Sequence, residues 1–377
     1  MGLTKYRLGD LIKRSSKKNI DVDNKYSKEV VRGISNLKKF MITKADLSDR
    51  KLDNFLIVPN NYFAFNRRTT RMGEKFAIAF NDSNEVYLVT NDYVVFSVKN
   101  VEVLSPSFLF IYFNRPEFDR YVRWNSWGSA TELFSWDQIC DIEINLPSIA
   151  IQKKYVAIYQ AMLKNQEAYE EGLEDLKLAK EIFLDKLKLN SAYTSLGKFI
   201  KQTDIRNKEF HNYQLKGLSM ENYFIDSIAK KEGLDLSNYK IVGPDEFACV
   251  LMKIGRDVRL TVALNNTCDY FLISPAYYSF QVSGIDKNYF MAFISRSEFE
   301  RRAWFSCDTS ARGSLSWEEF IDLQIPEPSN YHQKIISNLS LALIEKQEIN
   351  EKLKKQIKSM CPILIKGAME EACREGV

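Results

Sequence analysis

Two short segments of the sequence concentrate side chains that could bind nucleic acid. The first, FNRRTTRMGEK, starts at Phe65, and the second, MKIGRDVR, starts at Met252. The first supplies Asn66, Arg67, Arg68, Thr69, Arg71 and Lys75, and the second supplies Lys253, Arg256 and Arg259. Arginine and asparagine make paired hydrogen bonds with guanine and adenine edges, whereas lysine and threonine mostly hold phosphates. These segments therefore predict DNA contacts made from loops.

A second pair of basic segments differs in its residues although it keeps its length. RYVRWNSWGSAT starts at Arg120 and contributes Arg123 and Asn125; RRAWFSCDTSAR starts at Arg301 and contributes Arg301, Arg302 and Arg312. Aligned without gaps, the two share their first arginine and the serine nine positions later, and nothing between. Two modules that read different targets on one scaffold would show this pattern. Unselected drift on a solvated loop would show it equally well.

Catalytic signatures are missing from the sequence. It contains no GxxxxGK[ST] phosphate loop, no glycine-rich dinucleotide motif, no GxSxG and no Asn-Pro-Pro-aromatic tetrapeptide of the adenine methyltransferase type. Its two histidines, His211 and His332, stand in no metal-binding pattern, and its six cysteines form no CxxC pair. The net charge of +4 permits a polyanionic partner without requiring one. We therefore expect a recognition protein that is not an enzyme and needs no cofactor and no metal.

The chain carries an internal duplication. Trp136 and Trp317 are 181 positions apart, and so are Gln152 and Gln333. At this offset the window from residue 115 to residue 153 matches its counterpart identically at fourteen positions, whereas chance gives about two. Upstream segments repeat in the same order, for example KFAIAFND and RLTVALNN. The sequence therefore predicts two tandem copies of one fold.

Each copy combines a β-rich part with a long helix. Short apolar runs such as FAIAF and YVVFSV, separated by turn residues, predict strands. After Pro147-Ser148 and again after Pro328-Ser329, apolar residues recur at alternating spacings of three and four, which indicates a heptad seam. Such a seam needs a partner, so we expect the two helices to pair antiparallel about a pseudo-twofold axis. Pro362 is expected to kink or end the second helix near its last turn.

These features define a fold class and a compartment. We predict an α+β protein with two tandemly repeated, β-rich α/β recognition domains, each followed by a long helix, and with the helices paired as an antiparallel coiled coil. The aromatic residues mostly have core spacing, and Trp124 and Trp127 are the ones for which stacking on a ligand remains an alternative. The N-terminal segment has no apolar signal core and no run is long enough to span a bilayer, so we expect a cytoplasmic protein.

The duplicated plan resembles the specificity (S) subunit of type I restriction-modification systems. Two segments of the form S-W-x-x-(I/F)…I…P-S…Q-K carry the resemblance, at residues 135–153 and 316–334, and each leads into a heptad helix. The resemblance covers essentially the full chain. It implies target recognition domains at residues 1–146 and 191–327, and long helices at residues 147–190 and 328–377. Each domain would read one half of a bipartite, gapped sequence in double-stranded DNA.

The resemblance also implies partners. The helices would set the spacer between the half-sites and dock methyltransferase (modification) subunits, two of them, and restriction subunits could join the complex. The chemistry would belong to those partners. Two other functions stay open: a stand-alone DNA-binding regulator with two modules, and a coiled-coil adaptor whose repeated domains bind protein. A methyltransferase encoded next to this chain would favour the first function, and absence of salt-dependent DNA affinity would favour the adaptor.

Overall fold

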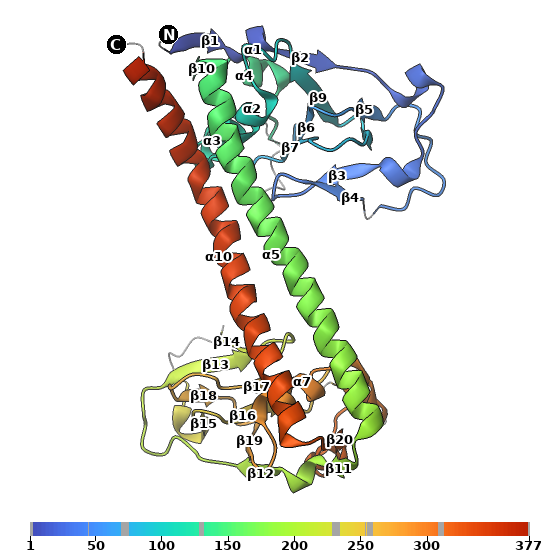
Figure 1. The fold of residues 1–377 in the computed structure, drawn as a ribbon, viewed down its shortest axis with the longest axis vertical. Helices are drawn as coiled ribbons and strands as arrows, with labels where there is room; N and C mark the ends of the chain where they lie inside the picture. The colour runs from blue at the N-terminus through green and yellow to red at the C-terminus, as the bar shows by residue number, and fades with distance from the viewer. Residues whose placement is uncertain are drawn as a thin grey trace. The chain divides into compact units, whose positions relative to one another are not determined.

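The fold was obtained as a computed structural model that describes residues 3–43, 45–68, 75–127, 132–227, 234–252, 254, 259–307 and 313–375. The chain divides into two units, which are described in turn. Unit 1 comprises Met1–Ala168 and Asn350–Val377, and unit 2 comprises Tyr169–Ile349. Each unit therefore contains one β-rich module and one end of both long helices (Figure 1). The domain boundaries at residues 146, 190 and 327 remain predictions.

A four-stranded antiparallel sheet lies at the centre of unit 1. Its strands follow the order β2 (Ile12–Ser15), β9 (Tyr93–Val98), β6 (Tyr62–Asn66) and β7 (Ile78–Phe80). Antiparallel pairs accompany it: β1 (Thr4–Arg7) with β10 (Glu143–Leu146), β3 (Arg32–Ile34) with β4 (Phe40–Ile42), and β5 (Leu56–Val58) with β8 (Tyr87–Val89). Short helices complete the module: α1 (Leu8–Leu11), α2 (Pro106–Phe113), α3 (Pro116–Trp124) and α4 (Trp136–Cys140).

Strand β6 shows how alternation builds this core. Phe63 and Phe65 point to one face, where they join the cluster formed with α2, α3 and the long helices. Ala64 points to the other face and packs with Val58 and Val95. The strand is buried on both faces, so an apolar run replaces the usual alternation of apolar and polar residues.

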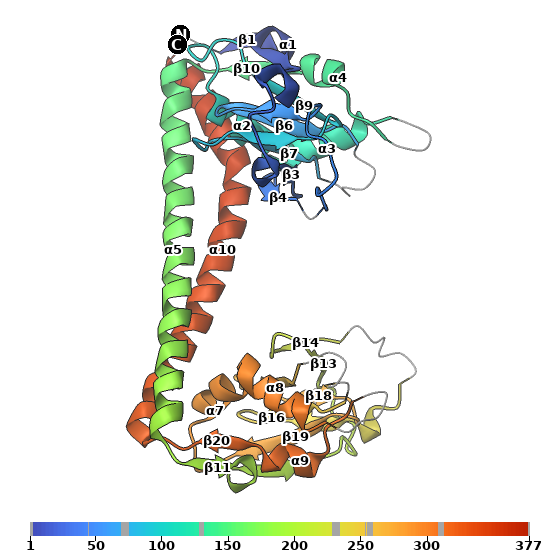
Figure 2. The same ribbon diagram turned by 90° about the vertical axis from the view of Figure 1, so that its right-hand side faces the viewer.

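Unit 2 repeats this plan. Its central antiparallel sheet has the order β12 (Ile200–Thr203), β19 (Tyr278–Val282), β16 (Phe247–Val250) and β17 (Thr261–Leu264). A second sheet has the order β14 (Phe224–Asp226), β13 (Gln214–Leu218), β18 (Phe271–Ile273) and β15 (Lys240–Val242), and β11 (Tyr193–Ser195) pairs with β20 (Gln324–Pro326). Its helices are α7 (Lys287–Ile294), α8 (Ser297–Phe305) and α9 (Trp317–Asp322), which Figure 2 shows beside the strands.

The repeated Ser-Trp pair begins a short helix in each unit. Ser135 caps α4 and Ser316 caps α9, each through a capping box with the residue three positions later. The following tryptophans pack into the core: Trp136 lies 5.5 Å from Phe96 and Trp317 lies 5.8 Å from Phe280, measured between ring centroids. Both tryptophans therefore pack against the core of their own unit.

The long helices α5 (Ile149–Asn190) and α10 (Asn330–Glu375) run antiparallel in both units (Figures 1 and 2). In unit 1, Lys154 forms an ion pair with Glu371 at 2.8 Å, and the buried Gln166 donates a hydrogen bond to Asn350 at 3.1 Å. In unit 2, the Phe183 ring lies 5.9 Å from the His332 ring. The predicted antiparallel pairing is confirmed, and the polar seam residues bond to each other, which favours one register.

Of the two expectations for Pro362, that it kinks or that it ends the second helix, the second is wrong. Helix α10 continues through Pro362 to Glu375. A proline removes one backbone hydrogen bond and crowds the preceding turn. The residues that follow it offset this cost because Leu364, Ile365 and Ala368 are buried in the core of unit 1. Among the described residues, no helix combines the length and apolar character needed to cross a bilayer.

Candidate nucleic-acid interface

In unit 1 the two predicted basic segments meet. The backbone nitrogen of Phe134 donates to the carbonyl oxygen of Arg67 at 2.9 Å, and Arg68 and Trp127 each form a β-bridge with Leu133. The end of β6 is thus joined to the segment that follows α3. Residues 69–74 and 128–131, which extend from this junction, lie outside the described residues, so Thr69 and Arg71 are not placed.

The arginines at this junction are exposed and only weakly held. The Arg67 Nε donates to the carbonyl oxygen of Asp92 at 3.4 Å, and the Arg68 guanidinium lies 3.5 Å from the Asp92 carboxylate. The Arg68 side chain remains 63% exposed. An ion pair with that exposure contributes about 1 kcal/mol or less to stability. Both guanidinium groups are therefore available to an anionic ligand.

The other predicted residues of unit 1 differ in their availability. Asn66 accepts a hydrogen bond from the Arg68 backbone nitrogen at 3.0 Å, so its side chain shapes its own loop. Asn125 caps the end of α3 by donating to the Tyr121 carbonyl oxygen at 2.8 Å. Arg123 is exposed on the last turn of α3, and Lys75 is half-buried. Arg67, Arg68 and Arg123 are thus exposed in unit 1.

Unit 2 repeats the junction with different side chains. The backbone nitrogen of Leu315 donates to the carbonyl oxygen of Leu251 at 2.9 Å, which reproduces the bond between Phe134 and Arg67. Leu251 is buried, and the next residue, Met252, is 42% exposed. The positions that carry two arginines in unit 1 therefore carry two apolar residues in unit 2. Lys253, Arg256 and Arg312 lie outside the described residues.

The remaining predicted residues of unit 2 separate into two kinds. Arg301 is exposed on α8, and Arg259 is exposed while donating to the Met220 carbonyl oxygen at 3.1 Å. Arg302 instead forms an ion pair with Glu298 at 2.7 Å. Glu298 also forms an ion pair with Lys188 of helix α5. Arg302 and Lys188 of the long helix thus share the Glu298 carboxylate, a contact that the position of Arg302 in a basic run did not indicate.

Sequence reasoning missed a buried ion pair beneath the first interface. Lys38, at the turn between β3 and β4, lies 2.6 Å from Asp119 on α3, and both side chains are less than 10% exposed. Burial lowers the pKa of Lys38, and the Asp119 charge opposes that effect. Asp119 also accepts a hydrogen bond from the Phe76 backbone nitrogen at 3.1 Å. It therefore fixes the returning end of the segment that begins at Arg67.

The counterpart of Asp119 in unit 2 is Glu300, which shares its place on the short helix and its burial. Burial raises the pKa of the Glu300 carboxyl group, and the positive charge of Arg259 opposes this. Lys38 and Arg259 are distant in sequence from Asp119 and Glu300, so no local pattern could have paired them with these carboxylates. The alignment at offset 181, however, could have shown the shared acidic position.

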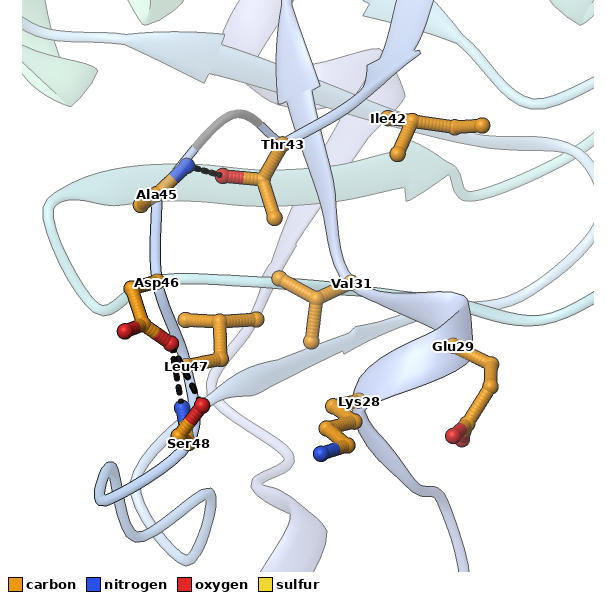
Figure 3. A pocket seen from close by; sticks show the side chains of 9 residues that line it. All are labelled: Lys28, Glu29, Val31, Ile42, Thr43, Ala45, Asp46, Leu47 and Ser48. Carbon is orange, nitrogen blue, oxygen red and sulfur yellow. Dashed lines mark hydrogen bonds between the residues drawn. The ribbon is translucent and has the colours of Figure 1, made fainter.

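Unit 1 also has a surface hollow between β4 and the turn that precedes Val31 (Figure 3). Its lining residues are Lys28, Glu29, Val31, Ile42, Thr43, Ala45, Asp46, Leu47 and Ser48. The Asp46 carboxylate is already occupied by hydrogen bonds from the Ser48 backbone nitrogen and hydroxyl, at 2.9 and 2.6 Å. Among the described residues, no group of three or more His, Cys, Asp and Glu side chains is arranged to hold a metal. The basic loop junctions are thus the strongest candidate sites.

Comparisons with known proteins agree with a role in recognition. Residues 2–177 match the family described as type I restriction modification DNA specificity domain. The S subunit of a type I restriction-modification system from M. genitalium has the same fold, with a TM-score of 0.56 and 12% identity over 98% of this chain and 96% of that chain. No curated protein matches the sequence significantly.

Two further solved structures align over nearly the full length. One, from a study of complex assembly and conformational transition of the type I R-M system, has a TM-score of 0.49 and 12% identity over 99% of this chain and 97% of that chain. The other, an HsdS subunit from Thermoanaerobacter tengcongensis, has a TM-score of 0.38 and 14% identity over 100% and 97%. The N-terminal part of the chain, residues 2–177, therefore matches a type I restriction modification DNA specificity domain, and the chain as a whole has the fold of the M. genitalium S subunit.

Proposed function

We propose that each β-rich module reads one half of a bipartite, gapped sequence in double-stranded DNA. The observation that carries this proposal is a backbone junction that recurs in both units with different side chains. The backbone bonds from Phe134 to Arg67 and from Leu315 to Leu251 are equivalent, yet arginines stand in one unit and apolar residues in the other. A common scaffold that carries different side chains at this junction suits two different half-sites.

In this proposal some of the cationic side chains contact phosphates and others contact bases. Exposed arginines and lysines, including Arg123, Arg259 and Arg301, supply phosphate contacts and hence an affinity that falls with salt. Arg67 and Arg68 would read base edges, where a bidentate contact with guanine contributes about 1–3 kcal/mol of discrimination. The segments that contain Thr69, Arg71, Lys253, Arg256 and Arg312 would extend both surfaces.

We further propose that the paired helices set the spacer and dock two methyltransferase subunits, to which restriction subunits can be added. The buried hydrogen bond between Gln166 and Asn350 supports a fixed helix register, because sliding the helices would leave both amides unpaired in an apolar seam. A fixed register is what a constant spacer requires. The complex would act in the cytoplasm, where it meets chromosomal DNA.

The test is methylome sequencing of cells that express this chain with and without a methyltransferase encoded beside it. A gapped, two-part methylated motif that appears only with both proteins is the expected result. Replacing residues 1–146 by the corresponding module of another family member should then change one half of the motif and leave the other. A motif that keeps both halves after the replacement would contradict the modular proposal. A complex that binds DNA without any methylated motif would favour the two-module regulator instead.

A further inference from the structure

Each module leaves one large aromatic ring in water at the same structural position. Trp124 is the last residue of α3 and is 80% exposed; Phe305 is the last residue of α8 and is 87% exposed. The two are 181 positions apart, the offset of the whole duplication. Neither ring contributes to a core, so packing does not explain why both modules place an aromatic residue there.

The surroundings of these rings are basic. Arg123 precedes Trp124 and is exposed, and Arg120 is exposed one turn earlier, where its 3.5 Å pair with Glu117 is a weak surface contact. In unit 2, Arg301 is exposed one turn before Phe305. An aromatic ring flanked by exposed cations is complementary to a polyanion with flat apolar faces, which describes the bases and phosphates of DNA.

The position of the rings sets them apart from the residues that read sequence. They lie in the segment where the two modules share no identical residue between Arg120 and Ser129 or their counterparts. An aromatic ring is nevertheless kept at this one position while its neighbours differ. A side chain kept in two modules that read different half-sites serves something that both half-sites share.

We propose that Trp124 and Phe305 are sequence-independent DNA contacts, one for each half-site, which stack on a base or insert into the base stack. The inference rests on the proposed function. Enzymes that modify a base turn it out of the duplex, and this exposes the faces of neighbouring bases. An aromatic side chain that stacks on such a face contributes about 1–3 kcal/mol. Trp127, which is 69% exposed and bridged to Leu133, would extend the contact in the first module.

The test uses the complete complex with its methyltransferase subunits and a fluorescent duplex that carries the methylated motif. Trp124→Ala and Phe305→Ala should each weaken binding about five- to a hundredfold. The slope of affinity against salt should not change, because neither ring contacts a phosphate. The exchanges Trp124→Phe and Phe305→Trp should bind like the wild type, since each module already accepts the other's ring chemistry. Val101→Ala, which removes an exposed apolar side chain elsewhere in unit 1, is the control and should have no effect.

The outcomes distinguish three cases. Unchanged affinity in both alanine variants would overturn the inference. The proposed function would still stand if the wild-type complex methylates a gapped motif. Loss of methyltransferase subunits from either variant in size-exclusion chromatography would also overturn it, because the rings would then be protein contacts. A wild-type complex that methylates no gapped motif would remove the proposed function and this inference together.

Discussion

Units 1 and 2 keep the same backbone pairings while their loops differ. Phe63 faces Phe96 across β6 and β9 in unit 1, and Phe247 faces Phe280 across β16 and β19 in unit 2. An asparagine follows the edge strand of each central sheet: Asn81 follows β7 and Asn265 follows β17. Each donates hydrogen bonds to two backbone carbonyl oxygens and accepts one from a serine or threonine hydroxyl. Buried polar side chains of this kind are costly to disrupt, so they persist with the fold.

The units differ most where a buried carboxylate needs compensation. Unit 1 supplies it with the ammonium group of Lys38, 2.6 Å from Asp119. In unit 2 the position at the same hairpin turn is occupied by Asn222, which accepts a hydrogen bond from the Val262 backbone nitrogen at 3.0 Å instead of reaching Glu300. The two copies thus share a backbone fold and a buried acidic position, whereas the residues that surround the buried carboxylate differ between them.

The largest expected effect comes from breaking the Lys38–Asp119 pair. Lys38→Met or Asp119→Leu alone leaves one charge buried without its partner, so each should lower the free energy of unfolding of unit 1 by about 3–5 kcal/mol. The double variant should recover most of the loss, because two apolar side chains replace the pair. Urea unfolding of the intact chain measures the three values. Single variants that cost less than about 1 kcal/mol would show that the pair is not a structural element of unit 1.

A repeated glutamine allows a closer comparison of the two units. Gln152 donates to the carbonyl oxygens of Val103 and Pro147 and accepts from the Ser105 backbone nitrogen, each at 2.9 Å. Gln333 donates to the Pro328 carbonyl oxygen and accepts from the Asp286 backbone nitrogen, each at 2.8 Å. Both glutamines are buried. They tie the first turn of each long helix to its own module.

Replacing either glutamine by leucine should therefore destabilise its own unit. Gln152→Leu leaves three backbone groups without their side-chain partner and should cost about 3 kcal/mol; Gln333→Leu leaves two and should cost about 2 kcal/mol. Thermal unfolding followed by circular dichroism gives the order of the two losses. Equal stability of both variants and the wild type would mean that water replaces the amide at these sites.

The duplication made much of this architecture predictable. Ser135 and Trp136 recur with their counterparts because a helix cap and a core ring need those residue types, and the heptad seam recurs because its residues pack between α5 and α10. Contacts between distant residues were not predictable. The pairing of Lys188 with Glu298, and the continuation of α10 through Pro362, depend on tertiary contacts that no local pattern encodes.

The candidate site was predictable at the level of segments only. Sequence patterns brought out the basic runs at Arg67 and Arg123, and the structure joins the two segments that contain them through Leu133. They could not distinguish the exposed Arg68 from Asn66, whose side chain bonds to its own loop, because both are polar residues in one run. Exposure and hydrogen bonding, which decide availability, follow from the folded backbone.

Arg68 and Met252 are a matched pair for sharpening the comparison of the two interfaces, because they follow equivalent junction residues. Arg68→Ala should weaken recognition of one half-site by about 1–3 kcal/mol and, because it removes a positive charge, should lower the dependence of affinity on salt. Met252→Ala removes a neutral side chain and should leave the salt slope unchanged. Binding to duplexes with either half-site altered separates the effects. Equal losses at both half-sites for Arg68→Ala would contradict a modular interface.

The smallest expected effect on stability concerns Glu300. Replacing Glu300 should stabilise its unit, whereas replacing Asp119 should destabilise its own. Burial raises the pKa of Glu300 in the folded chain above its ordinary value of 4.5, so the ionised carboxylate is penalised in the folded state at neutral pH. Glu300→Gln resembles the protonated acid, and we expect it to stabilise unit 2 by about 1 kcal/mol or less at pH 7.5. The gain should shrink as the pH falls through the raised pKa of the folded chain toward 4.5, and little of it should remain at pH 4, where the carboxyl group is mostly protonated in both states. Thermal unfolding at pH 7.5 and pH 4 measures both values. A variant less stable than the wild type at pH 7.5 would mean that Arg259 compensates Glu300 as fully as Lys38 compensates Asp119, and the two units would then share their electrostatics as well as their shape.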